Sequence, residues 1–173
     1  MEAPEEILWK RIKITALGLF CFLVVFSFFL PMWLARVKAQ PIAFSHARHA
    51  GVRQISCVFC HTGVLKGDMA GVPSVKDCMQ CHQVVRPDSP EVQKIQEHWD
   101  KGTPIEWFKV YNLPQHVHFS HRAHVSKGIE CKTCHGDLTH MDVVRREVDL
   151  NMGKCVSCHR ENKAPDDCTI CHR

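Results

Sequence analysis

The sequence predicts a mainly helical and irregular protein, with one N-terminal transmembrane helix followed by a small domain that has no ordinary apolar core. Three observations lead to this prediction. Residues 14–34 carry no charge. The chain of 173 residues contains 11 Cys and 13 His, far more than average composition. Beyond residue 40 the sequence is poor in Leu, Ile and Phe and is often interrupted by Gly and Pro, which favours loops and short helices and predicts no substantial sheet.

The uncharged segment Ile14–Leu34 is long enough to be a membrane anchor. Its 21 residues match, as an α-helix, the thickness of the hydrocarbon core of a bilayer. We therefore expect an N-terminal segment over residues 1–13 and an anchor helix over residues 14–35. A cleaved signal peptide is the alternative, but the apolar run is longer than such peptides usually have. Cys21 lies within the run and is interpreted as a membrane-facing thiol.

The other ten cysteines all occur in one short pattern. They form five Cys-x-x-Cys pairs, and His follows the second cysteine of every pair. The pentapeptides are CVFCH at 57–61, CMQCH at 78–82, CKTCH at 131–135, CVSCH at 155–159 and CTICH at 168–172. This is the attachment signature of c-type haem, in which two cysteines form thioethers to the porphyrin and the His binds the iron. Structural zinc also uses Cys-x-x-Cys pairs, but it does not require the adjacent His.

The sequence thus predicts five covalently bound c-type haems in residues 41–173. The predicted attachment residues are Cys57, Cys60, Cys78, Cys81, Cys131, Cys134, Cys155, Cys158, Cys168 and Cys171. The predicted proximal iron ligands are His61, His82, His135, His159 and His172. With about one haem for every 26 residues, the porphyrins would supply most of the buried apolar surface, so the haems form the core.

Two similar elements precede attachment motifs. FSHARHA at 44–50 lies before CVFCH, and FSHRAHV at 119–125 lies before CKTCH. This internal repeat divides the domain into unit one at 41–82 with two haems, a linker at 83–117, and unit two at 118–173 with three haems. In the linker, Ser-Pro at 89–90 followed by a polar segment that ends at Gly102 predicts a helix.

The Phe-x-His-x-x-His element ahead of closely spaced Cys-x-x-Cys-His motifs resembles the class III multihaem cytochromes. The resemblance implies that the first His of each element ligates the first haem of its unit and that the second His ligates the next haem. The implied distal ligands are His46 for the haem at Cys57/Cys60, His49 for that at Cys78/Cys81, His121 for that at Cys131/Cys134, and His124 for that at Cys155/Cys158.

The haem at Cys168/Cys171 needs another distal ligand. Trihaem members of the same family have a His shortly before the second attachment motif, where this sequence has Met152. We expect Met152 to be the ligand, and a thioether would raise the reduction potential of that haem. Further candidates are Met141, His140, His116 and His98.

Further features resemble the pentahaem subunit of alternative complex III, a quinol-oxidising membrane complex. They are the anchor, the 2 + 3 arrangement of haems, and the segments PIEWFKVYNLP at 104–114 and MDVVRREVDLNMGKCVSCHR at 141–160. The resemblance implies an electron-transfer subunit that is not an enzyme by itself. The implied partners are the membrane, an iron–sulfur subunit, quinol-binding membrane subunits, and a periplasmic acceptor such as a monohaem cytochrome c or a copper protein.

Covalent attachment of this kind takes place on the outer side of the cytoplasmic membrane, so we expect a single-pass protein with its haem domain in the periplasm. Six-coordinate haems leave no iron position open for a substrate, which favours electron relay over a multihaem reductase. The alternative function is a stand-alone membrane-anchored quinol dehydrogenase that feeds periplasmic reductases. A free periplasmic shuttle would require cleavage of the anchor. The net charge of +4 is small and dispersed, which argues against nucleic-acid binding.

Overall fold

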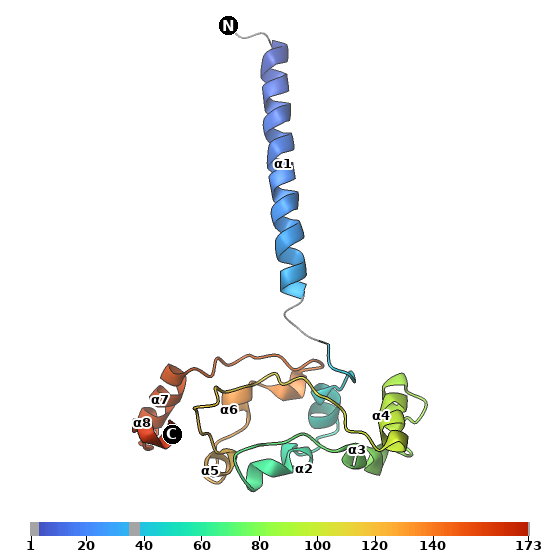
Figure 1. Cartoon of the computed structure of the whole chain (residues 1–173), viewed down its shortest axis with the longest axis vertical. Coiled ribbons are helices and arrows are strands. Elements are labelled where there is room, and N and C mark those ends of the chain that lie inside the picture. The colour runs from blue at the N-terminus through green and yellow to red at the C-terminus, as the bar shows by residue number, and fades with distance from the viewer. Residues whose placement is uncertain (1–3, 35–38, 173) are drawn as a thin grey trace. The chain divides into compact units, whose positions relative to one another are not determined.

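The computed structural model describes residues 4–34 and 39–172 (Figure 1). Within these residues the regular elements are helices, and the isolated antiparallel bridge between Val117 and His172 is the one pairing of strand type. The elements are α1 Pro4–Leu34, η1 Ala47–Val52, α2 Cys57–Cys60, η2 Thr62–Leu65, α3 Val75–His82, α4 Pro90–Lys101, α5 His121–Val125, α6 Lys132–His135, η3 Leu138–His140, α7 Met152–Glu161 and α8 Cys168–Cys171. The predicted fold class, helical and irregular behind one apolar helix, is confirmed.

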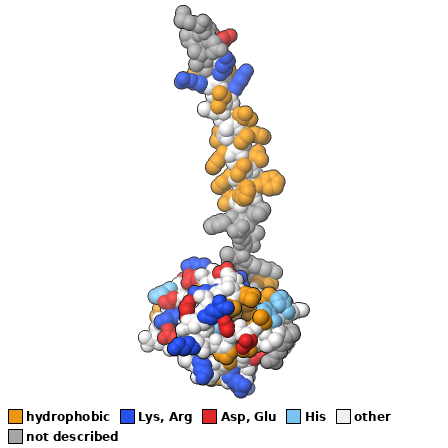
Figure 2. All heavy atoms as spheres, turned by 90° about the vertical axis from the view of Figure 1, so that its left-hand side faces the viewer, with side chains coloured by type: hydrophobic (Ala, Val, Ile, Leu, Met, Phe, Trp, Pro, Cys, Tyr) orange, Lys and Arg blue, Asp and Glu red, His pale blue; other side chains and the backbone are white. Residues whose placement is uncertain are grey.

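Backbone contacts divide the chain into two units, residues 1–38 and residues 39–173. The first contains α1, whose stretch Leu8–Leu30 has a mean hydropathy of 2.3 over 23 residues and is not buried by the protein. Hydrophobic side chains surround this stretch, and Lys and Arg gather toward its N-terminal end (Figure 2). Its length and composition suit a membrane-crossing helix and equally an N-terminal signal sequence. The helix starts earlier than predicted, and the predicted end at residue 35 lies outside the described residues.

The second unit has very little apolar core. Seven hydrophobic side chains are buried among the residues that the structure describes: Ile42, Val64, Met79, Val92, Ile95, Ile105 and Met141. Four of them, from the start of the domain, α3, α4 and the segment after α4, form one small cluster. A cluster of this size cannot stabilise a domain of about 130 residues, because small domains already depend on nearly all their apolar surface. The prediction that the polypeptide lacks an ordinary core is confirmed.

The linker helix α4 is also confirmed. Pro90 occupies its first turn, where a missing N–H costs nothing, although the side chain of Ser89 makes no capping hydrogen bond. Gly102 ends the helix in the left-handed conformation with φ 65°. Val92 and Ile95 form its buried face, and the helix packs on α3.

The two repeated units contact each other reciprocally. A helix begins within each Phe-x-His-x-x-His element and packs on a segment that follows the first attachment motif of the other unit. These contacts join η1 to η3 and α5 to η2. One backbone hydrogen bond recurs in both places. The amide of Ala47 donates to the carbonyl of Met141 over 3.0 Å, and that of Arg122 donates to the carbonyl of Gly67 over 3.1 Å. The first attachment motifs of the two units therefore lie in the middle of the domain.

Candidate haem-binding sites

Five pairs of histidine rings face each other in the domain. Each pair joins the His of one Cys-x-x-Cys-His motif to a His from elsewhere in the chain, and we number the sites 1 to 5 in the order of the motifs. The ring centroids are 6.4 Å apart for His46 and His61 at site 1, 6.1 Å for His49 and His82 at site 2, 6.3 Å for His121 and His135 at site 3, 5.9 Å for His124 and His159 at site 4, and 5.6 Å for His116 and His172 at site 5.

This spacing fits one metal ion between two imidazoles. Bonds of about 2 Å from each ring to the metal leave the two coordinating nitrogens about 4 Å apart and the ring centres about 2 Å further apart. Each pair supplies only two donors. In the described part of the chain, no group of three or more His, Cys, Asp or Glu side chains is suited to hold a bare ion. The donor set therefore fits an iron whose four other positions are filled by a porphyrin.

The hydrogen bonds of the rings leave the metal-binding nitrogen free. Six of the ten rings have Nδ1 within hydrogen-bond distance of a backbone carbonyl oxygen, which can only accept, so Nδ1 carries the proton and Nε2 keeps its lone pair. The bonds are His49 to Ser45, 2.8 Å; His61 to Gly71, 2.7 Å; His82 to Val85, 2.9 Å; His121 to Asp68, 2.6 Å; His124 to Ser120, 2.8 Å; and His159 to Pro165, 2.5 Å.

A phenylalanine contacts the two predicted distal histidines in each unit. The two histidines of each element are three residues apart, close to one helical turn, and the Phe ring two residues before the first His contacts both of their rings. The centroid separations are 4.9 Å for Phe44–His46, 4.3 Å for Phe44–His49, 4.8 Å for Phe119–His121 and 4.6 Å for Phe119–His124. The repeated Phe therefore fixes two neighbouring sites at once.

Two ring environments keep the imidazole neutral. Burial lowers the pKa of His46 to about 4, and the nearby rings of His61 and His49 lower it further. Burial also lowers the pKa of His135, followed by the ring of His121. A neutral imidazole is the form that coordinates a metal. The Nδ1 of His46 is buried and has no hydrogen-bond partner.

The cysteine pairs are presented on short helical turns. Cysteines three residues apart lie on the same side of a turn, as attachment to one porphyrin requires. α2 and α8 consist of little more than such a pair, while α3 and α7 carry theirs within longer helices. The ten motif cysteines form no disulfides in the described part of the chain.

Site 5 is assembled from the segment that precedes unit two. The bridge between Val117 and His172 and a 2.8 Å hydrogen bond from the amide of His118 to the carbonyl of Cys171 hold this segment along α8. The ring of His116 then lies against that of His172, with an interplanar angle of 23°.

The expectation that Met152 completes site 5 disagrees with this geometry. Met152 begins α7 and is 66% exposed, and the ring that faces His172 is that of His116. Met152 is predicted from the sequence because it lies shortly before the fourth attachment motif. The backbone pairing of residues 117–118 with α8, between segments more than 50 residues apart, has no local sequence signal.

Met141, His140 and His98 have surroundings that differ from those of His116. Met141 is only 3% exposed and packs in the interior. The ring of His140 lies 3.4 Å from the carboxylate of Asp137. His98, in α4, has its Nδ1 3.0 Å from the hydroxyl of Thr103. His116 is therefore the candidate ligand whose ring faces His172.

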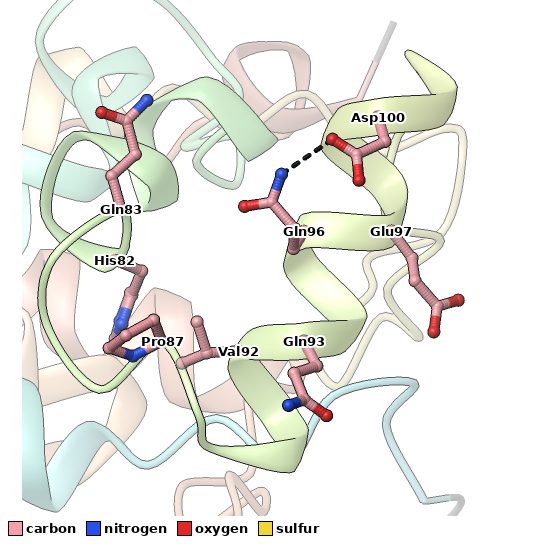
Figure 3. Close-up of a pocket in the computed structure, with 8 residues that line it drawn as sticks. All are labelled: His82, Gln83, Pro87, Val92, Gln93, Gln96, Glu97 and Asp100. Carbon is pink, nitrogen blue, oxygen red and sulfur yellow. Dashed lines mark hydrogen bonds between the residues drawn. The ribbon is translucent and has the colours of Figure 1, made fainter.

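A pocket of about 240 Å³ lies between the end of α3 and one face of α4 (Figure 3). Its lining residues are His82, Gln83, Pro87, Val92, Gln93, Gln96, Glu97 and Asp100, and Gln96 donates a 2.7 Å hydrogen bond to Asp100. Five of the eight lining residues have amide or carboxylate side chains, and His82 belongs to the motif of site 2. We assign no quinol site to it.

Comparisons with known proteins identify the family of the chain. Residues 31–106 match the Class III cytochrome C family, and residues 117–173 match the family of cytochrome c7 and related cytochrome c. The protein named menaquinone reductase, multiheme cytochrome c subunit, of Nitratidesulfovibrio vulgaris (strain Hildenborough) is 30% identical in an alignment of 172 positions, gaps included, that covers 83% of this chain and 81% of that protein. Attachment motifs, paired histidines and relatives lead to one conclusion: the chain belongs to the class III multihaem cytochromes c, which bind c-type haem and transfer electrons.

Proposed function

We propose that the chain is the electron-transfer subunit of a membrane quinol-oxidising complex similar to alternative complex III, and that it relays electrons through five c-type haems toward a periplasmic acceptor. The observation that carries the proposal is the set of five facing histidine pairs in one domain of about 130 residues. The apolar helix α1 and the family of the chain support it.

The proposed ligand set follows the ring pairs. The ten motif cysteines hold the porphyrins, and the five motif histidines are the proximal ligands. The distal ligands at sites 1 to 4 are His46, His49, His121 and His124, as the resemblance implies. At site 5 we propose His116 in place of Met152, because its ring faces His172.

Two imidazoles at each iron would determine what the chain can do. When bound, c-type haems supply one-electron carriers. The paired imidazoles occupy the positions at which a substrate would bind, and the carbonyl acceptors of their Nδ1–H groups hold the rings in place. The protein contributes orientation and exclusion of substrate, as an electron carrier requires, rather than the bond chemistry of an enzyme.

The proposed setting is the periplasmic face of the cytoplasmic membrane. Residues 14–35 cross the membrane once, residues 1–13 lie in the cytoplasm, and residues 41–173 form the haem domain. Quinol-binding membrane subunits and an iron–sulfur subunit would donate electrons, because the ten motif cysteines are assigned to haem and one apolar helix is too little to build a quinol site. A monohaem cytochrome c or a copper protein would accept them.

The opposite direction of transfer is the second candidate. The relative from Nitratidesulfovibrio vulgaris is named a menaquinone reductase subunit, which favours electron delivery from a periplasmic carrier to menaquinone. The same five sites serve both directions, because electron exchange between haems is reversible.

The test is purification of the full-length chain from native membranes, followed by intact mass and anaerobic reduction. We expect a mass with five haems and the N-terminal helix, co-purifying membrane subunits, and reduction by a quinol analogue in the complex but not in the separated subunit. Quinol reduction of the separated subunit would establish the stand-alone dehydrogenase, and a mature chain without α1 would establish the shuttle. Reduction by a periplasmic carrier followed by menaquinone reduction would establish the second candidate.

A further inference from the structure

We propose that the five haem sites form one row in the order site 2, site 1, site 3, site 4, site 5, so that electrons enter and leave through sites 2 and 5. The inference rests on the proposed assignment of the five sites. It concerns their spatial order, which the order of motifs in the chain does not give. Four contacts between neighbouring sites carry it.

The first link joins sites 2 and 1. Their distal ligands, His49 and His46, both contact the ring of Phe44. The first and second sites of unit one are therefore adjacent.

The second link joins sites 1 and 3, the first sites of the two units. η1 packs on η3 and α5 packs on η2, so the segments that follow the first attachment motif of each unit contact the other unit. The reciprocal packing of the two units brings these sites together. Asp68, in the loop that follows site 1, accepts the 2.6 Å hydrogen bond from Nδ1 of His121, the distal residue of site 3.

The third link joins sites 3 and 4. Phe119 contacts the rings of both distal residues, His121 and His124, just as Phe44 does in unit one. The ring pairs that these two residues form, with His135 and with His159, therefore lie beside one another.

The fourth link joins sites 4 and 5. Only residues 162–167 separate α7, which carries the site 4 motif, from α8, which carries the cysteines of site 5. Nδ1 of His159, in the site 4 motif, bonds to the carbonyl of Pro165 in the connection between α7 and α8. These short-range contacts hold the last two attachment helices together.

The links determine which sites lie at the ends. The units meet through sites 1 and 3, sites 2 and 4 lie outside them, and site 5 extends the row on the side of unit two. Figure 1 shows the same arrangement within the haem domain: α3 and α4 lie at one end, α7 and α8 at the other, and α2, α5 and α6 between them. Electrons that enter at site 2 must pass sites 1, 3 and 4 to reach site 5.

The direct test is the iron positions in the holoprotein. We would locate the five irons in the full-length chain in detergent by anomalous X-ray scattering or cryo-electron microscopy. The four shortest iron–iron distances are expected to be 2–1, 1–3, 3–4 and 4–5. A shorter distance between sites 2 and 3, or between sites 5 and 1, would overturn the row.

A matched pair of variants tests the order in solution. His121→Met at site 3 and His116→Met at site 5 each give one haem a thioether ligand, which raises its potential. A haem with a raised potential is reduced first, and its added negative charge lowers the reduction potentials of the neighbouring haems. This repulsion weakens with distance, so direct neighbours are affected most. NMR-monitored titration is expected to show two shifted neighbours, sites 1 and 4, for H121M and one, site 4, for H116M. Equal numbers of shifted neighbours would contradict the row.

The two tests separate this inference from the proposed function. A haem with an open iron position would give a high-spin signal in the spectra. That result would contradict the proposed electron-transfer function, whatever the order of the sites. A different set of iron distances defeats the row and leaves five six-coordinate haems intact.

Discussion

The two Phe-Ser-His-x-x-His elements have the same coordination geometry and different surroundings. The ring pairs at sites 1 and 3 are nearly parallel, at 3° and 7°, and those at sites 2 and 4 are tilted, at 60° and 47°. The second His of each element bonds to the carbonyl of the Ser, at 2.8 Å in both units. The hydrogen bond from the second His to the Ser carbonyl depends only on residues inside the element, and the ring pairs add the His of the attachment motifs that follow it.

The contacts supplied from outside the repeat differ. In unit two, Asp68 accepts the Nδ1 proton of the first His, His121. In unit one the residue at the corresponding place, Asp142, accepts instead from the hydroxyl of Ser45 at 2.5 Å, and Nδ1 of His46 stays buried without a partner. A repeated motif therefore repeats the ligands of a metal site, while the groups that orient and tune those ligands come from loops that do not repeat.

The largest expected effect is a change of spin state at site 5, which has no counterpart in unit one. His116→Ala removes the ring that faces His172, so one haem is expected to become high-spin. Met152→Leu removes the thioether and is expected to leave all five haems low-spin. Low-temperature EPR of the oxidised proteins measures both. A high-spin signal in M152L and none in H116A would restore Met152 as the ligand.

Next is the contact that packs unit two on η1. A methyl group on Gly51 would collide with the carbonyl of Thr139, so Gly51→Ala is expected to lower the free energy of unfolding by about 1–3 kcal/mol. Gly67 lies in the reciprocal contact, has open space around it, and makes a matched control: Gly67→Ala is expected to stay within about 0.5 kcal/mol. Thermal unfolding followed by circular dichroism of the haem band measures both, and equal effects would contradict the account.

Substitution of the two serines of the repeat is expected to have a smaller effect on the free energy of unfolding. Ser45 is buried and also accepts a 3.0 Å hydrogen bond from the amide of Arg48. Ser45→Ala leaves Asp142 without its donor and is expected to cost about 1–2 kcal/mol. Ser120, in the same position of unit two, does not link the units through its hydroxyl, so Ser120→Ala is expected to stay within about 0.5 kcal/mol. Chemical denaturation compares the two, and a larger loss in S120A would reverse the comparison.

The smallest effect depends on pH. The amide before each Phe is held differently: that of Ala43 donates to the carboxylate of Glu91 at 2.6 Å, and that of His118 donates to a backbone carbonyl. The hydrogen bond from Lys94, and then that from Ala43, lower the pKa of Glu91. A lowered carboxyl pKa gives stability that is present above the unfolded pKa and lost as pH falls through the folded pKa.

Glu91→Gln is therefore expected to reduce stability by about 1 kcal/mol at pH 7, and the difference from the wild type is expected to shrink below the ordinary Glu pKa. Thermal unfolding of both proteins between neutral and acidic pH measures it. A difference that grows as the pH falls would contradict the sign of this linkage.

The sequence predicted what is local in this molecule. Attachment motifs, the helix at 90–101 and the lack of an ordinary core all follow from residues close together in the chain. The partner of His172 did not, because a backbone pairing between residue 117 and the last attachment helix brings His116 there. The one sequence clue was position 116 itself, two residues before the start of unit two and outside the family pattern. The hydrogen bond from Ser45 to Asp142 likewise joins residues 97 positions apart, which local sequence does not indicate.

The central claim is that five sites each hold iron between two imidazoles. Low-temperature EPR of the fully oxidised, full-length holoprotein, with near-infrared magnetic circular dichroism, tests it most directly. The account predicts five low-spin haems with two histidine ligands: rhombic signals from the nearly parallel pairs at sites 1 and 3, and more anisotropic signals from the tilted pairs at sites 2 and 4. A high-spin ferric signal, or the charge-transfer band of a methionine-ligated haem, would contradict it.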